Sequence, residues 1–322
     1  MKRILLGVAL LLLIGSIVLT TVGAAATVGP TRVGALSGIT GLAMVKLMEG
    51  PGSDRARQYD IEVYKSPDLL AAKVVAGEED IAALPINTAA ILYNRGVPIQ
   101  VVSVIGWGVL YIVTNEPAVK GWAGLKGKEV YVPAKGTVPD LLLRYLAAKN
   151  GLVPERDFTL HYIASPVELA QLTAAGKAGL AVLPEPWVTQ VTMRNDQYRI
   201  ALDLQKEWRK IERQSLTYPQ TCVVVSQKRL AADPKFLAQF RKDLAASIGW
   251  VNRQPQQAGV LAERLVQIPA SAVQLGIKRC NLKYVDAMKV KGEISRFLER
   301  LGEKTPEAVG GKVPDEGFYY QP

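Results

Sequence analysis

The chain has 322 residues, of which 49% are hydrophobic and 21% charged, and 39 Lys and Arg against 29 Asp and Glu give a formal net charge of +10. This length allows two domains that each bury a sizeable core. The basic residues are scattered among acidic ones and are not grouped with aromatic residues, so the composition argues against nucleic-acid binding.

The N-terminus has the three parts of an export signal. Lys2 and Arg3 precede an uncharged apolar run over residues 4–22, which ends in the small-residue stretch GAAAT. This pattern predicts a signal peptide over residues 1–26, removed after export. A permanent N-terminal membrane anchor is the alternative, because about 19 apolar residues just span a bilayer.

Short apolar runs then alternate with helical patterns. The strand patterns of this first half cover residues 31–36, 59–65, 80–85, 99–106 and 110–115. The helical patterns between them cover residues 38–50, 66–77 and 87–96. Alternation of strands and helices predicts a mostly parallel sheet that is covered on both faces.

The alternation restarts after residue 115. Strand patterns cover residues 128–136, 158–164, 180–184 and 198–204, and helical patterns cover 137–151, 165–179 and 185–195. Residues 66–85 and 165–184 align without gaps and are identical at nine of 20 positions, including Ser-Pro, Ala-Gly and Leu-Pro. Such self-similarity predicts two similar α/β lobes.

Three of these helices carry N-terminal signals. Ser66 is the expected N-cap of the helix over residues 66–77, with Pro67 in its first turn. Thr137 with Asp140, and Ser165 with Glu168, have the spacing of capping boxes.

The last hundred residues begin with a strand pattern at 221–226 and continue as helical patterns over 233–254, 257–267, 270–279 and 286–302. We expect these helices to return to the first lobe. The first lobe then comprises residues 27–115 and 218–322, and the second comprises residues 116–217. The fold class is thus α/β, with two Rossmann-like lobes joined by hinge crossings at the strands 110–115 and 221–226.

Four turns follow strands in these lobes, at residues 36–41, 85–88, 134–139 and 184–187. Ligands of open parallel sheets bind beyond the carboxyl ends of the strands, where helix N-termini present free N–H groups. Facing lobes would therefore line a cleft with these turns. Each turn also has a purely structural interpretation, because Ser, Thr and Asn are common helix caps and Gly relieves backbone strain.

Trp107 lies between two glycines at the end of a strand pattern. We interpret it as an aromatic wall for a ligand, with core packing as the alternative.

Residues for common catalytic chemistry are missing from the sequence. His161, the one histidine, lies within a strand pattern, and no G-x-S-x-G, P-loop or dinucleotide-binding motif occurs. No His/Cys cluster could hold a metal, so we expect neither a metal nor a cofactor. Cys222 and Cys280 either pair in a disulfide or are buried separately. These absences favour binding over catalysis.

The sequence resembles the type II periplasmic solute-binding proteins of ABC transporters. The branch that it is similar to handles nitrate, taurine, aliphatic sulfonates and thiamine-precursor pyrimidines. The resemblance rests on RVGALSGITGLAMVKLMEG, SPDLLAAKVVAGEEDIAALPINTAAILYNRG, LKGKEVYVPAKGTVPDLLLRYLAAKNGL, LAVLPEPW and VGGKVPDEGFYY, which follow one another along nearly all of the mature chain.

The resemblance implies a monomeric periplasmic protein whose lobes close around one solute and then dock on an inner-membrane permease. The ligand-contacting positions that it implies are Ser37, Gly38, Thr40, Asn87, Thr88, Gly136, Thr137, Glu185 and Trp187. Lys135 is the only cation in the four turns and is opposed by Glu185, so we expect a small organic solute with an aromatic or amine portion rather than a simple anion.

Two other functions fit the same pattern. One is an enzyme on the two-lobed fold, with Glu185 as acid or base and a small heterocycle as substrate. The other is a sensor domain that passes its closed state to a membrane receptor.

Overall fold

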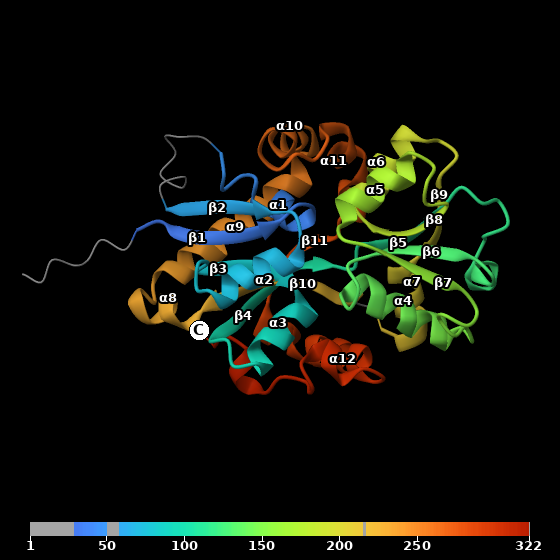
Figure 1. The fold of residues 1–322 in the computed structure, drawn as a ribbon. Helices are drawn as coiled ribbons and strands as arrows, with labels where there is room; N and C mark the ends of the chain where they lie inside the picture. The colour runs from blue at the N-terminus through green and yellow to red at the C-terminus, as the bar shows by residue number, and fades with distance from the viewer. Residues whose placement is uncertain (1–28, 50–57, 215–216, 322) are drawn as a thin grey trace, which may run out of the picture.

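The structure is a computed structural model that describes residues 29–49, 58–214 and 217–321. The predicted signal peptide, residues 1–26, lies outside these ranges. The described chain forms a mixed α/β fold with two sheets that lie side by side, each with helices on both faces (Figure 1). Within the described ranges, no helix has the length and apolarity needed to cross a bilayer.

The first sheet has six strands in the order β11–β4–β10–β3–β1–β2. Strands β1, β2 and β3 are parallel, whereas β10 runs antiparallel to both β3 and β4. Its strands are β1 (Thr31–Leu36), β2 (Tyr59–Tyr64), β3 (Ile81–Pro85), β4 (Ile99–Trp107), β10 (Pro219–Ser226) and β11 (Leu282–Asp286). The edge strand β11 was not predicted, because its sequence LKYVD neither alternates strictly nor is continuously apolar.

The second sheet has five strands in the order β7–β6–β8–β5–β9. Strands β6, β7 and β8 are parallel, and β5 is antiparallel to β8 and β9. Its strands are β5 (Leu110–Thr114), β6 (Glu129–Pro133), β7 (Thr159–Ile163), β8 (Leu180–Pro184) and β9 (Arg199–Asp203). The triplets β2–β1–β3 and β7–β6–β8 have the same order, and each is followed by an antiparallel strand. The prediction of two similar lobes is confirmed.

The two crossings lie just before the strands that were predicted to form them. Strand β5 belongs entirely to the second sheet and β10 entirely to the first, so the chain passes between the lobes at Gly108–Val109 and again between residues 213 and 218. Gly108 has a φ of +58°, and a Cβ atom there would lie 2.6 Å from Thr217 Oγ1. Only glycine fits this backbone and this space.

Helices cover the sheets in two layers. The helices are α1 (Ile39–Met44), α2 (Pro67–Val75), α3 (Ile86–Asn94), α4 (Val138–Lys149), α5 (Pro166–Ala174), α6 (Trp187–Arg194), α7 (Leu204–Glu212), α8 (Gln227–Ala232), α9 (Phe236–Arg253), α10 (Pro255–Val266), α11 (Ala270–Gly276) and α12 (Lys291–Gly302). Helices α2, α3, α4, α7 and α12 pack on one face of the sheets, and α1, α5, α6, α9, α10 and α11 pack on the other.

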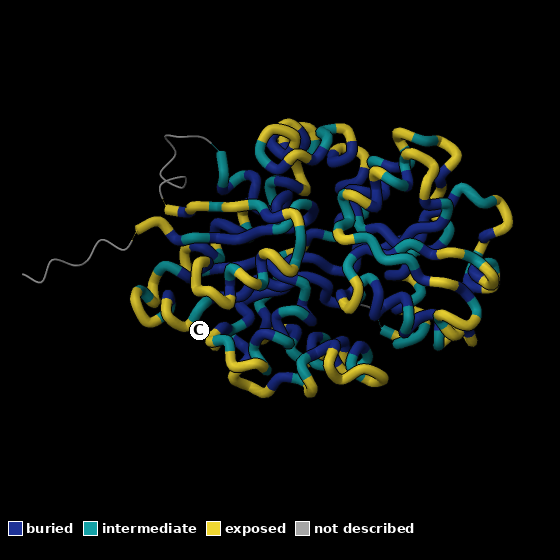
Figure 2. Tube along the Cα trace, in the orientation of Figure 1, coloured by how far each residue is buried: buried dark blue, intermediate teal, exposed yellow. Residues whose placement is uncertain are grey.

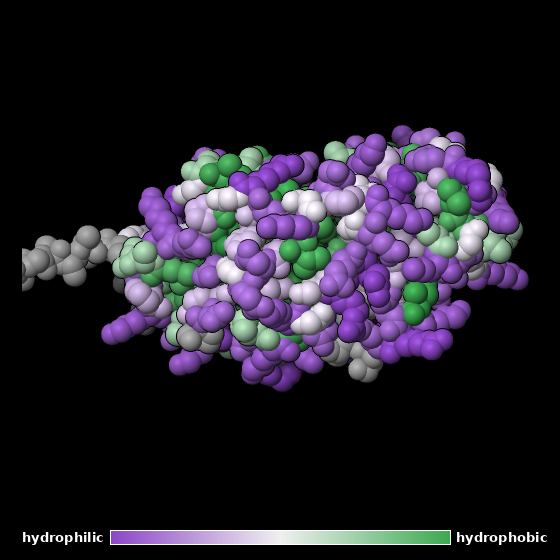
Figure 3. Space-filling view, turned by 90° about the horizontal axis from the view of Figure 1, so that it is seen from below, coloured by the Kyte–Doolittle hydropathy of each residue, from purple (hydrophilic) through white to green (hydrophobic). Residues whose placement is uncertain are grey.

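Each layer has its own hydrophobic core, and each core runs through both lobes. One core includes Val101 of the first sheet and Val182 of the second, and the other includes Val223 and Leu183. Figure 2 shows these buried segments along both sheets. On the lower face of the molecule, seen in Figure 3, the apolar side chains form small patches separated by hydrophilic residues.

All three predicted N-cap residues occupy the N-caps of their helices, and the cap hydrogen bond forms at two of them. Ser66 Oγ accepts a hydrogen bond from Leu69 N at 3.4 Å, and Ser165 Oγ accepts one from Glu168 N at 3.2 Å. Thr137 occupies the N-cap of α4, but its side chain makes no capping hydrogen bond. The capping box predicted there is therefore wrong, because the Thr137 hydroxyl donates back to Ala134 O instead.

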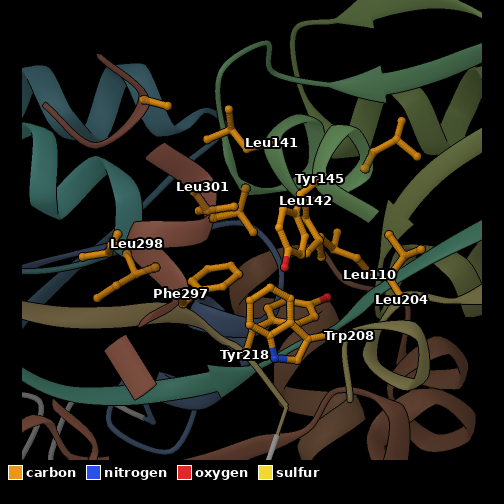
Figure 4. Packing of buried hydrophobic residues seen from close by; sticks show 14 of the residues in the cluster. Leu110, Leu141, Leu142, Tyr145, Leu204, Trp208, Tyr218, Phe297, Leu298 and Leu301 are labelled. Atoms are coloured by element: carbon orange, nitrogen blue, oxygen red, sulfur yellow. The ribbon is translucent and has the colours of Figure 1, made fainter. Parts of the chain in front are cut away.

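Aromatic side chains join both lobes on the lower side (Figure 4). Phe297 of α12 stacks on Tyr218 with ring centres 5.2 Å apart and meets Trp208 of α7 edge-on at 5.2 Å. Tyr145 of α4 lies 5.6 Å from Trp208. Helix α7 was not predicted, although Leu204 and Trp208 bury one face of it.

Replacing Phe297 by alanine tests how much this aromatic cluster contributes to the stability of the fold. The side chain is fully buried, and deleting a buried Phe ring costs about 3–5 kcal/mol of stability. We expect Phe297→Ala to lower the free energy of unfolding in urea by that amount. Leu275→Ala, at a side chain that is 65% exposed, should lower it by less than about 0.5 kcal/mol. Equal losses in the two variants would contradict the proposed role.

Candidate ligand-binding site

A cavity with a volume of about 90 Å³ lies between the lobes. Residues of both sheets line it, at the carboxyl ends of the parallel strands β1, β3, β6 and β8. The lining residues are Leu36, Ser37, Ile39, Thr40, Pro67, Pro85, Val109, Pro133, Ala134, Thr137, Val138, Pro139, Pro166, Pro184, Glu185, Gln220 and Thr221. Each of the four predicted turns contributes to this lining.

The cavity has fewer backbone N–H donors than the four turns predicted, because prolines occur in the first turns of the helices around it. Pro67 and Pro166 open α2 and α5, and Pro139 lies in the first turn of α4. Proline has no N–H, so each of these helices has one donor fewer at the end that faces the cavity. The expectation that backbone amides converge on a ligand needs this correction: the helix ends converge, but several of their donors are absent or bonded.

Two threonines occupy equivalent places in the two lobes, and their hydroxyls bond locally. Thr40 Oγ1 accepts from Leu36 N at 2.8 Å and donates to Leu36 O at 2.9 Å. Thr137 Oγ1 donates to Ala134 O at 2.6 Å. Both residues line the cavity, but their hydroxyls form hydrogen bonds within their own turns and stabilise the conformation of these turns.

Glu185 has a fully buried carboxylate that is bonded from both lobes. Its Oε2 accepts from Thr189 N at 3.1 Å, in the first turn of α6. Its Oε1 accepts from Arg279 Nε at 2.5 Å, and Arg279 Nη2 donates to Thr189 Oγ1 at 2.6 Å. The carboxylate thus stabilises the α6 N-terminus and pairs with a cation from the C-terminal part of the first lobe.

The contact that brings Arg279 to Glu185 depends on a glycine. Gly276 ends α11, and a Cβ atom there would lie 2.6 Å from Thr189 Oγ1 and 3.1 Å from Glu185 Oε2. Helix α11 therefore packs against the start of α6 more closely than any side chain allows. The two lobes are in contact here.

The first crossing is held by hydrogen bonds on both sides. Val109 N donates to Gln220 Oε1 at 3.1 Å, and Val109 O accepts from Glu185 N at 3.0 Å. The two crossings and the turn after β8 thus form one unit that borders the cavity. Sequence reasoning missed Gln220 and its neighbour Thr221, although their place directly before a crossing strand was a usable signal.

Other predicted site residues lie around the cavity without lining it. Asn87 Nδ2 donates across the cleft to Gly136 O at 3.1 Å, and it also donates to Ala308 O. A Cβ atom on Gly38 would lie 3.6 Å from Trp187 Nε1, so these two predicted residues also approach each other from opposite lobes. Thr88 is half-buried in the first turn of α3 and is not part of the lining.

Lys135 and Trp107 lie away from the cavity. Lys135 is exposed, with its Nζ 5.4 Å from the centre of the Tyr162 ring. Trp107 is buried, and its indole N–H donates to Lys283 O at 3.0 Å. Trp107 borders a different hollow, with Asn252 and Asn281. The structure therefore does not bring Trp107 together with the four turns.

Cys222 and Cys280 are separate, buried thiols with no disulfide between them. Burial raises the pKa of both thiols, and the nearby Glu185 carboxylate adds to the effect at Cys280. Burial also raises the pKa of Tyr162, beside the turn at residues 134–139, to about 12. Across residues 29–49, 58–214 and 217–321, no group of three or more His, Cys, Asp or Glu side chains is placed to hold a metal ion.

The two lobes have the same α/β strand order, and a cavity lies between them at the carboxyl ends of their parallel strands. This is the architecture of two-lobed binding proteins. The profile of the NMT1-like family matches residues 57–266, and the chain belongs to this family.

Solved structures agree with this assignment. An ABC transporter structure from Parabacteroides distasonis is 31% identical and superposes with a TM-score of 0.77, over 91% of this chain and 99% of the other. The alkanesulfonate-binding protein SsuA from Xanthomonas axonopodis, bound to MOPS, is 19% identical, with a TM-score of 0.67 over 89% and 95%. Comparison with curated protein sequences gave no match.

The nitrate-binding protein NrtA from Synechocystis is 14% identical to this chain. It has a TM-score of 0.66 over 88% of this chain and 84% of the other. At such identities the similarity shows the periplasmic binding protein fold, which confirms the predicted fold class.

Gly276→Ala tests the contact between α11 and α6. The added methyl group overpacks the contact between α11 and α6, which costs about 1–3 kcal/mol. Such a cost lowers the ratio of molecules in which the two lobes touch to molecules in which they are separated by a factor of roughly five to 150. Small-angle scattering should show a larger radius of gyration. In Gly292→Ala a Cβ atom meets nothing within 4 Å, so this control should scatter like the wild type. Equal scattering from all three proteins would contradict the role of Gly276.

Proposed function

We propose that the protein is the substrate-binding component of an ABC import system, which captures a small organic solute between its lobes and delivers it to an inner-membrane permease. The observation that carries this proposal is the cavity lined by both lobes, with the lobes in contact beside it. Membership of the NMT1-like family and similarity to an ABC transporter structure support it.

Export and location form part of the same proposal. The charged and apolar pattern of residues 1–26 supports signal-directed export, and the periplasmic binding protein fold supports a periplasmic location. The mature protein would act as a monomer that docks on its permease. The comparisons leave an N-terminal anchor as the alternative.

We further propose lobe boundaries at the crossings and a role in binding rather than catalysis. Residues 109–214 would move as one lobe, and the chain on either side as the other. Gly108–Val109 and Thr217–Tyr218 would be the hinges. The Glu185 carboxylate, which the enzyme hypothesis uses as acid or base, is bonded to Thr189 and Arg279. These bonds favour a structural role for it.

The proposal predicts a closing motion that spin labels can measure. Leu69 on α2 and Glu168 on α5 are exposed on opposite lobes, so Leu69→Cys with Glu168→Cys provides one label in each. The native cysteines are buried and should stay unlabelled, because burial raises the pKa of both thiols. The solute that co-purifies with the protein is identified by native mass spectrometry, removed and added back.

We expect the distance between the two labels to shorten, and its distribution to narrow, when the solute is added back. The control pair Leu69→Cys with Val260→Cys lies within the first lobe, and its distance should not change. An inter-lobe distance that stays the same at saturating solute would refute the proposed function.

A further inference from the structure

We propose that the cavity selects a small solute without net charge that carries a carbonyl-like acceptor, and that Gln220 and Thr221 determine this specificity. This inference rests on the proposed function and specifies its ligand class. The two residues begin β10, outside the four turns, and both are more than nine-tenths buried.

The side-chain amide of Gln220 has a fixed orientation. Val109 N carries a hydrogen, so the atom of Gln220 that lies 3.1 Å from it must be the oxygen. The amide nitrogen is consequently the free end of the side chain. No acceptor for Gln220 Nε2 occurs among the described residues, although Gln220 lines the cavity. Gln220 Nε2 is not one of the fully buried side-chain atoms that lack a partner, so it is accessible from the cavity. A ligand acceptor can therefore take the place of water at this donor.

Thr221 and Ser37 add hydroxyl groups to the same cavity. Thr221 lines it and is 6% exposed, and Ser37 lines it from the turn after β1. Within the described part of the chain, neither hydroxyl has a hydrogen-bond partner. This differs from Thr40 and Thr137, whose hydroxyls are bonded within their turns. Gln220, Thr221 and Ser37 are therefore the polar groups of the lining that a solute can bond.

The lining offers no unpaired charge. Glu185 is its one charged residue in the described chain, and the Arg279 guanidinium neutralises the Glu185 carboxylate. Lys135 contacts the Tyr162 ring instead of the cavity. An ionic solute would lose its hydration here without gaining a counter-charge, and this loss disfavours both anions and cations.

The helix ends do not substitute for a counter-charge. Anions bind helix N-termini through free N–H groups, but Pro67, Pro139 and Pro166 remove one N–H from each of three helices around the cavity. Ser66 and Ser165 occupy a further donor in α2 and α5. Helix α1, whose Ile39 and Thr40 line the cavity, keeps the N–H groups of its first turn and has no side-chain cap. Its N-terminus carries roughly half an elementary charge, which is less than a full counter-charge, so the site as a whole suits a neutral molecule better than an ion.

The cavity is small and partly open to solvent, so small probes suit it. A water molecule needs about 10–15 Å³ of such volume, so 90 Å³ holds roughly six to nine water molecules. The three planar probes urea, nitrate and guanidinium fit this volume and are close in shape, but their charges are 0, −1 and +1. They therefore separate charge selection from shape selection.

Titrations of the full mature chain with urea, sodium nitrate and guanidinium chloride test the proposal. In each titration, binding is measured by NMR from the shift of the Val109 amide signal. We expect urea to shift this signal saturably at millimolar concentration, because ligands of so few atoms bind weakly. Nitrate and guanidinium should bind at least about tenfold more weakly. Tighter binding of either ion, or saturable binding of none of the three, would overturn the ligand class.

Variants identify the residues responsible. Gln220→Glu keeps an oxygen for Val109 N–H but replaces the donor, so it should weaken urea binding at least about tenfold. Gln239→Glu makes the same change at an exposed site and should bind urea like the wild type. Thr221→Val should weaken binding, and Thr221→Ser should retain it. Unchanged binding in Gln220→Glu, with wild-type thermal unfolding, would refute the role of Gln220.

The spin-label experiment separates this inference from the proposed function. If a charged co-purified solute closes the lobes, the ligand class is wrong and the proposed function stands. If a neutral solute closes them in the wild type but not in Gln220→Glu, both are supported. If no solute closes them, the proposed function fails.

Discussion

The contact between the two lobes depends on how one buried charge is compensated. The Glu185 carboxylate has no contact with solvent, and such a group is stable only when hydrogen bonds and a cation compensate the loss of water. Thr189 supplies the hydrogen bonds from the same lobe, and Arg279 supplies the cation from the other. If the lobes separate, Arg279 moves away from Glu185 and the ion pair is lost. The position of the lobes is therefore coupled to the pairing of this carboxylate.

Local patterns allowed most of the fold to be predicted from the sequence. The ungapped match between residues 66–85 and 165–184 reflects two equivalent helices between equivalent strands, and Ser66 and Ser165 cap those helices in the same way. Caps and periodicity depend on residues within a few positions of one another, so sequence reasoning can reach them. Strand β11 was missed because its sequence LKYVD, at a sheet edge, neither alternates strictly nor is continuously apolar.

The site was less accessible to sequence reasoning, because its contacts depend on how the lobes meet. Arg279 is 94 residues from Glu185, and nothing local to either residue indicates the other. The role of Gln220 was equally hard to predict, because it depends on a hydrogen bond to Val109, which lies in the other crossing and is distant in sequence. The four turns were predicted to line the cleft, and residues of each turn do line the cavity. The consequence of the prolines at the helix starts was missed, because Pro67, Pro139 and Pro166 each lack an N–H donor.

The position of β10 has a consequence for the order in which the chain can fold. This strand lies between β3 and β4 inside the first sheet, but it follows the whole second lobe in sequence. A ribosome therefore completes every strand of the second sheet before it supplies the strand that joins the two halves of the first. Until then β3 and β4 have no shared neighbour, and the N-terminal half of the chain stays incompletely folded.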